Sequence, residues 1–284
     1  MSYDDELTAF RKYAELYPHN TTLLVDTYDT LRSGVPNAIK VFTELREAGK
    51  LPEKYGIRLD SGDLAYLSKK ARKMLDDAGF KDATITASSD LDEYIIDSLK
   101  AQGAKIDSWG VGTKLITSKD WPAFGGVYKL AAVWKGGRFI PKIKLSENQW
   151  KITNPGNKKV IRVYEKESGK VKADLIALAD EVFSPDKPLL LFDPHATWKK
   201  TLLQPGTYTL RELMVPVFIS GKCVYNSPSV MEIREYCMKE LDSLWDECRR
   251  LVNPHIVYVD LSQKLYNMKT RLLNKLTDNI KGLS

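Results

Sequence analysis

The chain has 284 residues, 43% hydrophobic and 28% charged, which is an ordinary balance for a globular protein long enough to bury its own core. Its net charge of +6 permits an anionic partner, but the basic residues are scattered and no aromatic–basic motif indicates nucleic acid. No apolar run approaches the roughly 20 residues that span a bilayer, the acidic start lacks a signal-peptide pattern, and three cysteines without metal spacing fit a reduced, cytoplasmic protein.

The first part of the chain alternates short apolar strands with amphipathic helices. Helices are expected over residues 5–17, 37–48, 64–78 and 91–102, and strands over 22–25, 57–59, 84–87 and 108–111. The short connections imply parallel strands with right-handed crossovers. Because four strand–helix segments are half of an eight-fold barrel, we expect an irregular, partial α/β barrel.

The pattern changes beyond about residue 125, where strands and hairpins dominate. Strands are expected over 128–133 and around 162–164, a hairpin turn at 167–170, an antiparallel sheet or extended wrapping over 186–225, and helices over 229–252 and 262–275. We therefore expect two domains. Residues 1–130 form the barrel portion, and residues 131–284 form an additional α+β portion that completes the second domain.

Polar turns follow the expected strands, at the edge where parallel sheets bind ligands. The most informative turn contains Arg58, Asp60, Ser61 and Asp63, and Gly62 lets its backbone bend closely around a ligand. Arg58 and Asp60 should point to the same face of their strand, where a cation is costly unless an anion or carboxylate meets it. Asp60 and Asp63 are candidates for holding ribose hydroxyls or Mg²⁺ on pyrophosphate, although Asp63 also fits a simple helix cap.

Two further turns carry candidate ligand-binding groups. Asp90 and Glu93 have capping-box spacing, which leaves Ser88 and Ser89 free to contact a ligand. The later Gly110-Val111-Gly112-Thr113 turn is suited to cradling a phosphate through backbone N–H groups, with the Thr113 hydroxyl as an extra donor. Lys129 lies on a strand pattern and is either an exposed edge lysine or a phosphate ligand.

Taken in order, these motifs closely resemble the nicotinate phosphoribosyltransferase family over essentially the whole chain. The stretches that carry the resemblance are residues 24–31, 34–38, 58–63, 88–93, 109–113, 125–130 and 259–262. The resemblance implies a type II phosphoribosyltransferase-like α/β barrel with a second domain, assembled as a cytoplasmic homodimer. It also implies a transferase of NAD biosynthesis that joins nicotinate to 5-phosphoribosyl pyrophosphate, with Mg²⁺ and with ATP as co-substrate, to give nicotinate mononucleotide.

The family's site residues carry over by position. Arg58 would contact the nicotinate carboxylate, and Asp60 would bind the ribose and act in catalysis. The phosphoribosyl pyrophosphate site would comprise Asp60, Ser61, Gly62, Ser88, Ser89, Gly110, Gly112, Thr113 and Lys129, with Mg²⁺ near Asp60 and Asp63. Such chemistry calls for positioned charges rather than a covalent nucleophile.

The resemblance also implies that the family has an N-terminal domain, the first barrel strands and a phosphorylated histidine ahead of the segment that begins at Met1. We therefore expect this chain to be the C-terminal majority of the enzyme, without ATP coupling and with most or all catalysis lost. A non-catalytic subunit or remnant of the fold, and another barrel enzyme acting on a phosphorylated sugar, are the alternatives. Nicotinamide is the alternative base, and the sequence of residues 58–63 favours nicotinate.

Overall fold

The structure, a computed structural model, describes residues 2–123, 125–148, 151–196 and 198–281. It divides into two compact units, Met1–Gly125 (unit 1) and Gly126–Ser284 (unit 2). Each unit has a hydrophobic core of its own. The boundary lies at Gly125, slightly before the expected one at residue 130.

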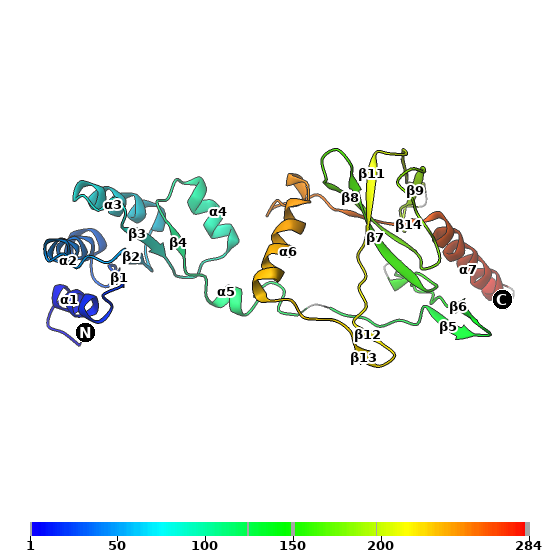
Figure 1. Cartoon of the computed structure of the whole chain (residues 1–284), viewed down its shortest axis with the longest axis horizontal. Helices are drawn as coiled ribbons and strands as arrows, with labels where there is room; N and C mark the ends of the chain where they lie inside the picture. Colours follow the sequence, from blue (N-terminus) through cyan, green and yellow to red (C-terminus); the bar gives the residue numbers. More distant parts are fainter. Residues whose placement is uncertain (1, 124, 149–150, 197, 282–284) are drawn as a thin grey trace. The chain divides into compact units, whose positions relative to one another are not determined.

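Unit 1 is built on a four-stranded parallel sheet whose strands follow chain order, as expected for half of a barrel (Figure 1). Its strands are β1 (Asn20–Leu24), β2 (Lys54–Leu59), β3 (Thr84–Ala87) and β4 (Ser108–Trp109). The last strand has two residues rather than the expected four, because the chain leaves the sheet at Gly110. Among the described residues, β1 and β4 are the edges of this sheet.

The helices of unit 1 lie close to their expected positions. They are α1 (Glu6–Leu16), α2 (Val35–Glu47), α3 (Leu64–Asp77), α4 (Glu93–Ala101) and the short α5 (Thr113–Ile116), with a π-helical turn at Thr30–Gly34. The expected cap of α4 is wrong: Asp92, not Asp90, accepts a hydrogen bond from Ile95 N at 2.8 Å. The chain turns first through Ser89, at φ 104°, so the helix starts two residues later than expected.

The two faces of the unit 1 sheet have different surroundings. Strand alternation places Leu23, Ile57 and Ile85 on the face that packs in the main core with residues of α2 and α3. The strand registers put Leu24, Arg58, Thr86 and Ser108 side by side on the other face. This open face carries Arg58, whose side chain is 47% exposed. The helices therefore bury one face of the sheet and leave a polar row on the other.

Unit 2 is built on a six-stranded mixed sheet with the order β10-β9-β14-β8-β7-β11. Its strands are β7 (Lys158–Glu165), β8 (Val171–Leu178), β9 (Leu189–Phe192), β10 (Lys200–Leu203), β11 (Tyr208–Glu212) and β14 (Tyr258–Ser262). The pair β14–β8 is parallel and the other pairs are antiparallel. The expected hairpin turn at 167–170 is confirmed between β7 and β8, and the expected antiparallel pairing within 186–225 is confirmed for β9 with β10.

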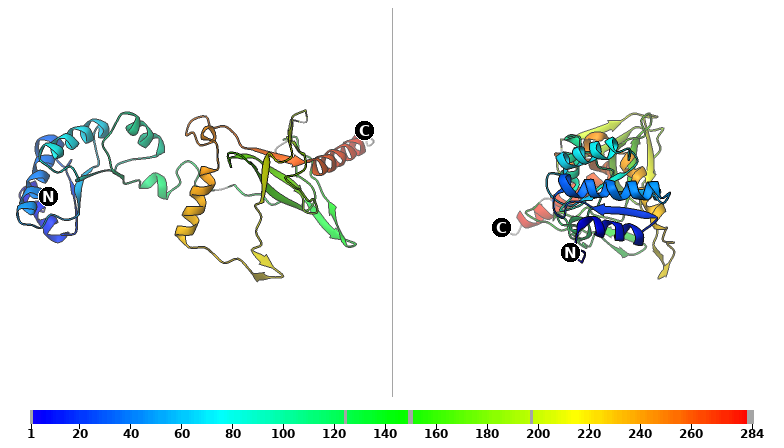
Figure 2. Two further views of the ribbon diagram at one scale, coloured as in Figure 1. Left: turned by 45° about the horizontal axis from the view of Figure 1, so that its top comes forward. Right: turned by 90° about the vertical axis from the view of Figure 1, so that its left-hand side faces the viewer.

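Two hairpins extend away from this sheet, as the left view in Figure 2 shows. They are formed by β5 (Ala132–Lys135) with β6 (Arg138–Pro141), and by β12 (Phe218–Ile219) with β13 (Lys222–Cys223). The expected strand over 128–133 is therefore largely wrong. It begins only at Ala132, and Lys129 lies outside any strand.

The two helices of unit 2 are α6 (Val230–Asp242) and α7 (Gln263–Lys281). The helix expected over 229–252 ends at Asp242, because Ser243 caps it and a separate 3-10 turn, Asp246–Cys248, follows. Trp245 fixes this break by donating Nε1–H to Val171 O at 2.9 Å.

An ion cluster joins α6 to the sheet. Arg162 on β7 contacts both carboxylate oxygens of Asp174 on β8, at 2.8 and 3.0 Å, and donates to Glu240 on α6 at 2.9 Å. Arg211 on β11 makes two more hydrogen bonds to Glu240, at 2.7 and 2.6 Å. The pKa of Glu240 is held below its usual range, first by Arg211. Paired charges therefore hold this helix on the sheet.

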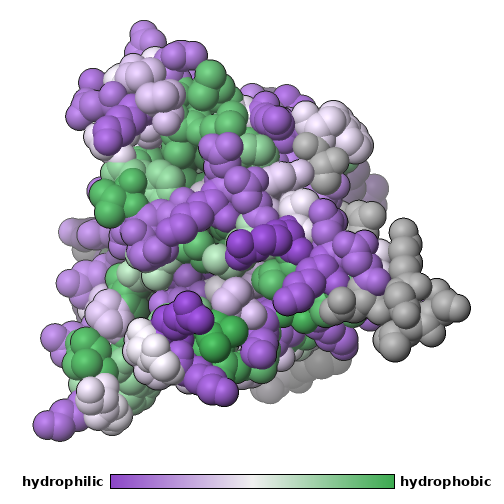
Figure 3. Space-filling view, turned by 90° about the vertical axis from the view of Figure 1, so that its right-hand side faces the viewer, coloured by the Kyte–Doolittle hydropathy of each residue, from purple (hydrophilic) through white to green (hydrophobic). Residues whose placement is uncertain are grey.

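The face drawn in Figure 3 has apolar side chains between polar ones. In the described part of the chain, no helix is long and apolar enough to cross a membrane.

Candidate functional site

Three of the expected site residues form one hydrogen-bonded network at the ends of neighbouring strands. Arg58 Nε donates to Ser88 Oγ at 2.7 Å, and Arg58 Nη2 donates to Asp60 Oδ1 at 3.1 Å. The Ser88 hydroxyl in turn donates to Asp60 Oδ1. The network is formed because β2 and β3 are adjacent and parallel, so the turns after them meet at one edge. It fixes the guanidinium on the open face of the sheet.

The electrostatics of this network favour an ionised Asp60. The hydrogen bond from Ser88 is the main cause that holds the pKa of the Asp60 carboxyl below its usual range; burial opposes it, and the contacts with Arg58 add to the lowering. Asp60 Oδ2 has no hydrogen-bond donor among the residues described. The site thus presents one partly exposed guanidinium and one carboxylate oxygen that remains available to a ligand.

Asp26, at the end of β1, supports the same turn and was not among the expected site residues. Its Oδ2 accepts from Asp60 N at 2.7 Å and from Ser61 Oγ at 2.8 Å. Ser61 is therefore engaged with Asp26. The position of Asp26 in a polar turn after the first strand is the sequence feature that could have identified it as a site residue.

Asp63 acts as a helix cap: its Oδ1 accepts from Tyr66 N at 2.9 Å at the start of α3. Gly62 adopts φ +77°, which only glycine takes at low cost, so the tight bend expected there is confirmed. The described residues contain no group of three or more His, Cys, Asp or Glu side chains placed to share a metal ion. Asp60 Oδ2 fits a Mg²⁺ ion held by one carboxylate and the substrate's phosphates, which is the usual arrangement for this ion.

The glycine-rich turn lies beside Ser88. Gly110 N donates to Ala87 O at 2.7 Å, and a Cβ added at Gly110 would lie 3.3 Å from Ser88 Cβ. Glycine therefore allows the turn after β4 to approach the turn after β3. Ser89 lies at the bend between them, where its carbonyl accepts from Leu91 N.

Gly112 and Thr113 begin α5 and are both exposed. The first N–H groups of a helix have no intrahelical partner and so remain available to an anion. An ion pair between Lys114 on α5 and Asp92 at the start of α4 holds this helix in place. The sequence did not single out this pair.

Lys129 is the one expected site residue that lies in unit 2. Its Nζ donates to Lys151 O at 2.8 Å in the same unit. This hydrogen bond lies within unit 2, and a role of Lys129 at the phosphate stays a prediction.

The remaining turns offer a coherent set of groups. A guanidinium suits a carboxylate, an ionised carboxyl suits ribose hydroxyls, and exposed backbone N–H groups suit a phosphate. All of them lie at, or directly after, the carboxyl ends of parallel strands in one unit.

Comparison with known proteins gives a consistent result. The family model for the nicotinate phosphoribosyltransferase C-terminal domain matches residues 157–269. The nicotinate phosphoribosyltransferase of Bacillus subtilis (strain 168) is 47% identical over 279 residues, covering 98% of this chain and 56% of the relative. The Homo sapiens relative of the same name is 33% identical over 268 residues, covering 92% and 48%.

Solved structures show the same fold. The crystal structure of human nicotinic acid phosphoribosyltransferase matches with a TM-score of 0.72 and 29% identity, over 94% of this chain and 50% of that chain. A nicotinate-nucleotide pyrophosphorylase from Pyrococcus furiosus matches with a TM-score of 0.52 and 20% identity, over 84% and 51%, which indicates the fold alone. The chain spans about half the length of the curated relatives it matches.

A half-barrel with charged turns in one unit and a mixed α+β sheet in the other define the type II phosphoribosyltransferase architecture. The proteins of similar sequence indicate which family within this class the chain resembles. The chain is similar to nicotinate phosphoribosyltransferases over nearly its whole length, and its residues 157–269 match the C-terminal domain of that family.

Proposed function

We propose that this chain carries the nicotinate- and phosphoribosyl-binding turns of a nicotinate phosphoribosyltransferase and serves NAD salvage. The observation that carries the proposal is the Arg58–Ser88–Asp60 network on the open face of the unit 1 sheet. It combines a positioned cation with an ionised carboxylate, which are the two groups that a carboxylate-bearing base and a developing sugar cation require.

In this reaction the ring nitrogen of nicotinate forms a bond to C1 of the ribose as the bond from C1 to pyrophosphate oxygen breaks. Arg58 would hold the nicotinate carboxylate, and its hydrogen bond to Ser88 would keep the guanidinium oriented. Asp60 would bind ribose hydroxyls and stabilise the positive charge that develops on the sugar. The free backbone N–H groups of Gly112 and Thr113 would hold the phosphate, and Gly110 would bring this turn close to Ser88.

The auxiliary groups belong to the same proposal. Mg²⁺ would neutralise pyrophosphate and contact Asp60, and ATP would be a co-substrate. Ser61 and Gly62 would shape the ribose-binding turn, and Ser89 would assist at the phosphate. For Lys129, a role in phosphate binding is supported only by the resemblance to the family. A cytoplasmic homodimer is the assembly that the family comparison suggests.

The test is nicotinate mononucleotide formation by the purified, folded chain, with nicotinate, phosphoribosyl pyrophosphate, Mg²⁺ and ATP present and then omitted in turn. Titration calorimetry with phosphoribosyl pyrophosphate accompanies it, so that binding is measured separately from turnover. The proposal expects binding of phosphoribosyl pyrophosphate that weakens at least tenfold in Asp60→Asn. A folded sample that neither binds this substrate nor forms product would contradict the proposal.

A further inference from the structure

Unit 2 contains a cavity of about 620 Å³ that the proposed reaction does not use. It is bordered by β14, by the segment after β9 and by the inward side of α7, all within the same unit. Its apolar walls include Ile152, Ile176, Val257 and Val259. Three charged side chains, those of Asp193, Asp260 and Lys269, line it as well.

Lys269 is the first unusual group in this cavity. Its side chain belongs to a residue only 7% exposed, yet it has no hydrogen-bond acceptor and no carboxylate within ion-pair distance among the residues described. Burial lowers the pKa of this lysine. Lys269 Nζ is not one of the atoms sealed from solvent, so this largely buried side chain ends in the cavity, with no protein group described to compensate its charge.

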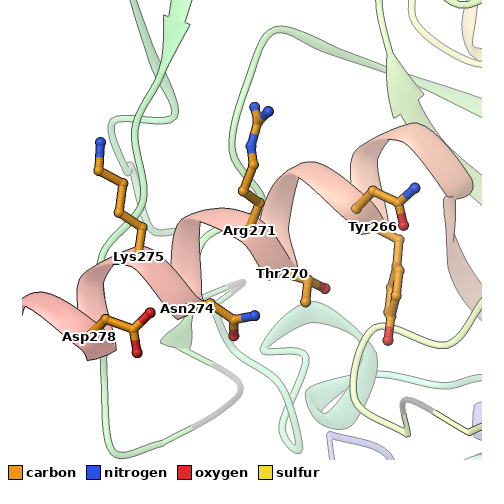
Figure 4. Close-up of a pocket in the computed structure, with 7 residues that line it drawn as sticks. Tyr266, Thr270, Arg271, Asn274, Lys275 and Asp278 are labelled. Atoms are coloured by element: carbon orange, nitrogen blue, oxygen red, sulfur yellow. The ribbon is translucent and has the colours of Figure 1, made fainter.

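The opposite side of α7 provides a contrast. Arg271, Lys275, Thr270, Asn274 and Asp278 of α7 line an open, solvent-exposed pocket. In Figure 4, Arg271 and Lys275 extend upward from the helix and the other three extend downward. Lysines there are solvated, as is usual for a surface helix. Lys269 instead shares the buried side of the helix with Leu265, which is fully buried.

Asp260 is the second unusual group, with the opposite charge. It is 7% exposed and has no hydrogen-bond donor in the described part of the chain. Phe192 pairs with Leu261, so the same antiparallel register brings Asp193 opposite Asp260. Burial and then the charge of Asp193 raise the pKa of Asp260, and Lys199, whose Nζ lies over the Tyr258 ring, offsets this only in part.

A third polar group in the cavity also lacks a partner. Asn154 lines the cavity, and its Oδ1 is sealed from solvent without a hydrogen-bond donor. Buried polar atoms are normally satisfied, so such an atom needs an explanation. The cavity therefore presents a lysine and a carboxylate without described partners between apolar walls, whereas the sealed Asn154 Oδ1 does not face it.

We propose that this cavity binds a small zwitterion of the α-amino acid class with an apolar side chain, its carboxylate on Lys269 and its ammonium group on Asp260. Such a ligand supplies the missing partner to each buried charge at once. A simple anion would leave Asp260 and Asp193 facing each other, and a simple cation would leave Lys269 unpaired. The apolar walls accommodate the side chain.

The first test measures binding to the wild-type chain by titration calorimetry, with L-leucine and L-phenylalanine as probes. N-acetyl-L-phenylalanine lacks the ammonium group and L-phenylalaninamide lacks the carboxylate. We expect at least one amino acid to bind with Kd below about 1 mM and both modified forms to bind at least tenfold more weakly. No binding of either amino acid, or equal binding of the acetylated form, would overturn the proposal.

The second test uses Lys269→Met and Asp260→Asn, each expected to weaken the amino acid that binds by at least tenfold. Lys275→Met is the matched control, because it removes a lysine from the solvated side of the same helix. Both cavity variants remove an uncompensated buried charge, so their thermal unfolding midpoints should not fall. Unchanged affinity in a folded Lys269→Met variant would also overturn the proposal.

Discussion

The charged groups of the unit 1 turns and those of the unit 2 cavity are organised in opposite ways. Arg58 and Asp60 are partly exposed, and each has hydrogen-bond partners that fix its position. Lys269 and Asp260 are almost fully buried, and the residues described leave them unpaired. The charged groups of unit 1 are already held in position and can bind a ligand without rearranging. The charged groups of the cavity lack partners, which a bound ligand would supply. The comparison suggests that buried, unpaired charges point to sites as clearly as charged turns do.

The largest expected effect is on the binding of nicotinate. Arg58→Gln removes the guanidinium that would pair with the base's carboxylate, so we expect affinity to fall about 30- to 100-fold, as for a lost charged hydrogen bond. Calorimetry with nicotinate in the presence of phosphoribosyl pyrophosphate measures this. Arg32→Gln is the matched control, because the Arg32 side chain is 91% exposed. Equal losses in the two variants would contradict the role of Arg58.

Glu240→Gln tests a paired charge in the same unit as the cavity. It leaves Arg162 and Arg211 without their shared carboxylate, so we expect the free energy of unfolding to fall by about 2 kcal/mol. Urea denaturation measures the change. Glu235→Gln, on the exposed surface of α6, should change it by less than about 0.5 kcal/mol. A similar result for both variants would mean that the cluster does not hold α6.

Lys269→Met should change the free energy of unfolding in the opposite direction. Removing an unpaired buried charge is expected to raise the free energy of unfolding by about 1–2 kcal/mol at neutral pH. The folded-state pKa of Lys269 is lowered, so the wild type regains stability as pH rises from that pKa toward the unfolded value near 10.4. The gap between the two proteins should therefore narrow in alkaline urea titrations. A destabilised variant at neutral pH would show that the ammonium group is satisfied.

The smallest effect is expected for the stability that Asp60 contributes. Its pKa is lowered in the folded state, so this contribution is present above the unfolded pKa and is lost as pH falls through the folded one. Because the side chain is 45% exposed, the loss should stay below about 1 kcal/mol. Urea titrations of wild type and Asp60→Asn should differ at pH 6 and converge below about pH 3. A difference that persists in acid would exclude this cause.

The sequence predicted the strand–helix order of unit 1 because alternating patterns and cap residues are local signals. Arg58 and Asp60 were also predictable, since two residues apart on a strand share a face. Which of Asp90 and Asp92 caps α4 was not predictable, because both have suitable spacing. The turn at Ser89 determines where the helix begins. Lys269 gave no signal, because a lysine on an amphipathic helix normally faces water. Its burial depends on how α7 packs against a sheet assembled from distant strands.

The decisive experiment on the role of Arg58 compares nicotinate with nicotinamide in calorimetric titrations of the wild-type chain, with phosphoribosyl pyrophosphate and Mg²⁺ present. The two bases differ in charge at the group that Arg58 would contact. We expect nicotinate to bind at least tenfold more tightly, because only its carboxylate pairs with the guanidinium. Equal affinities, or a preference for nicotinamide, would contradict the assignment of the Arg58–Ser88–Asp60 network as the nicotinate site.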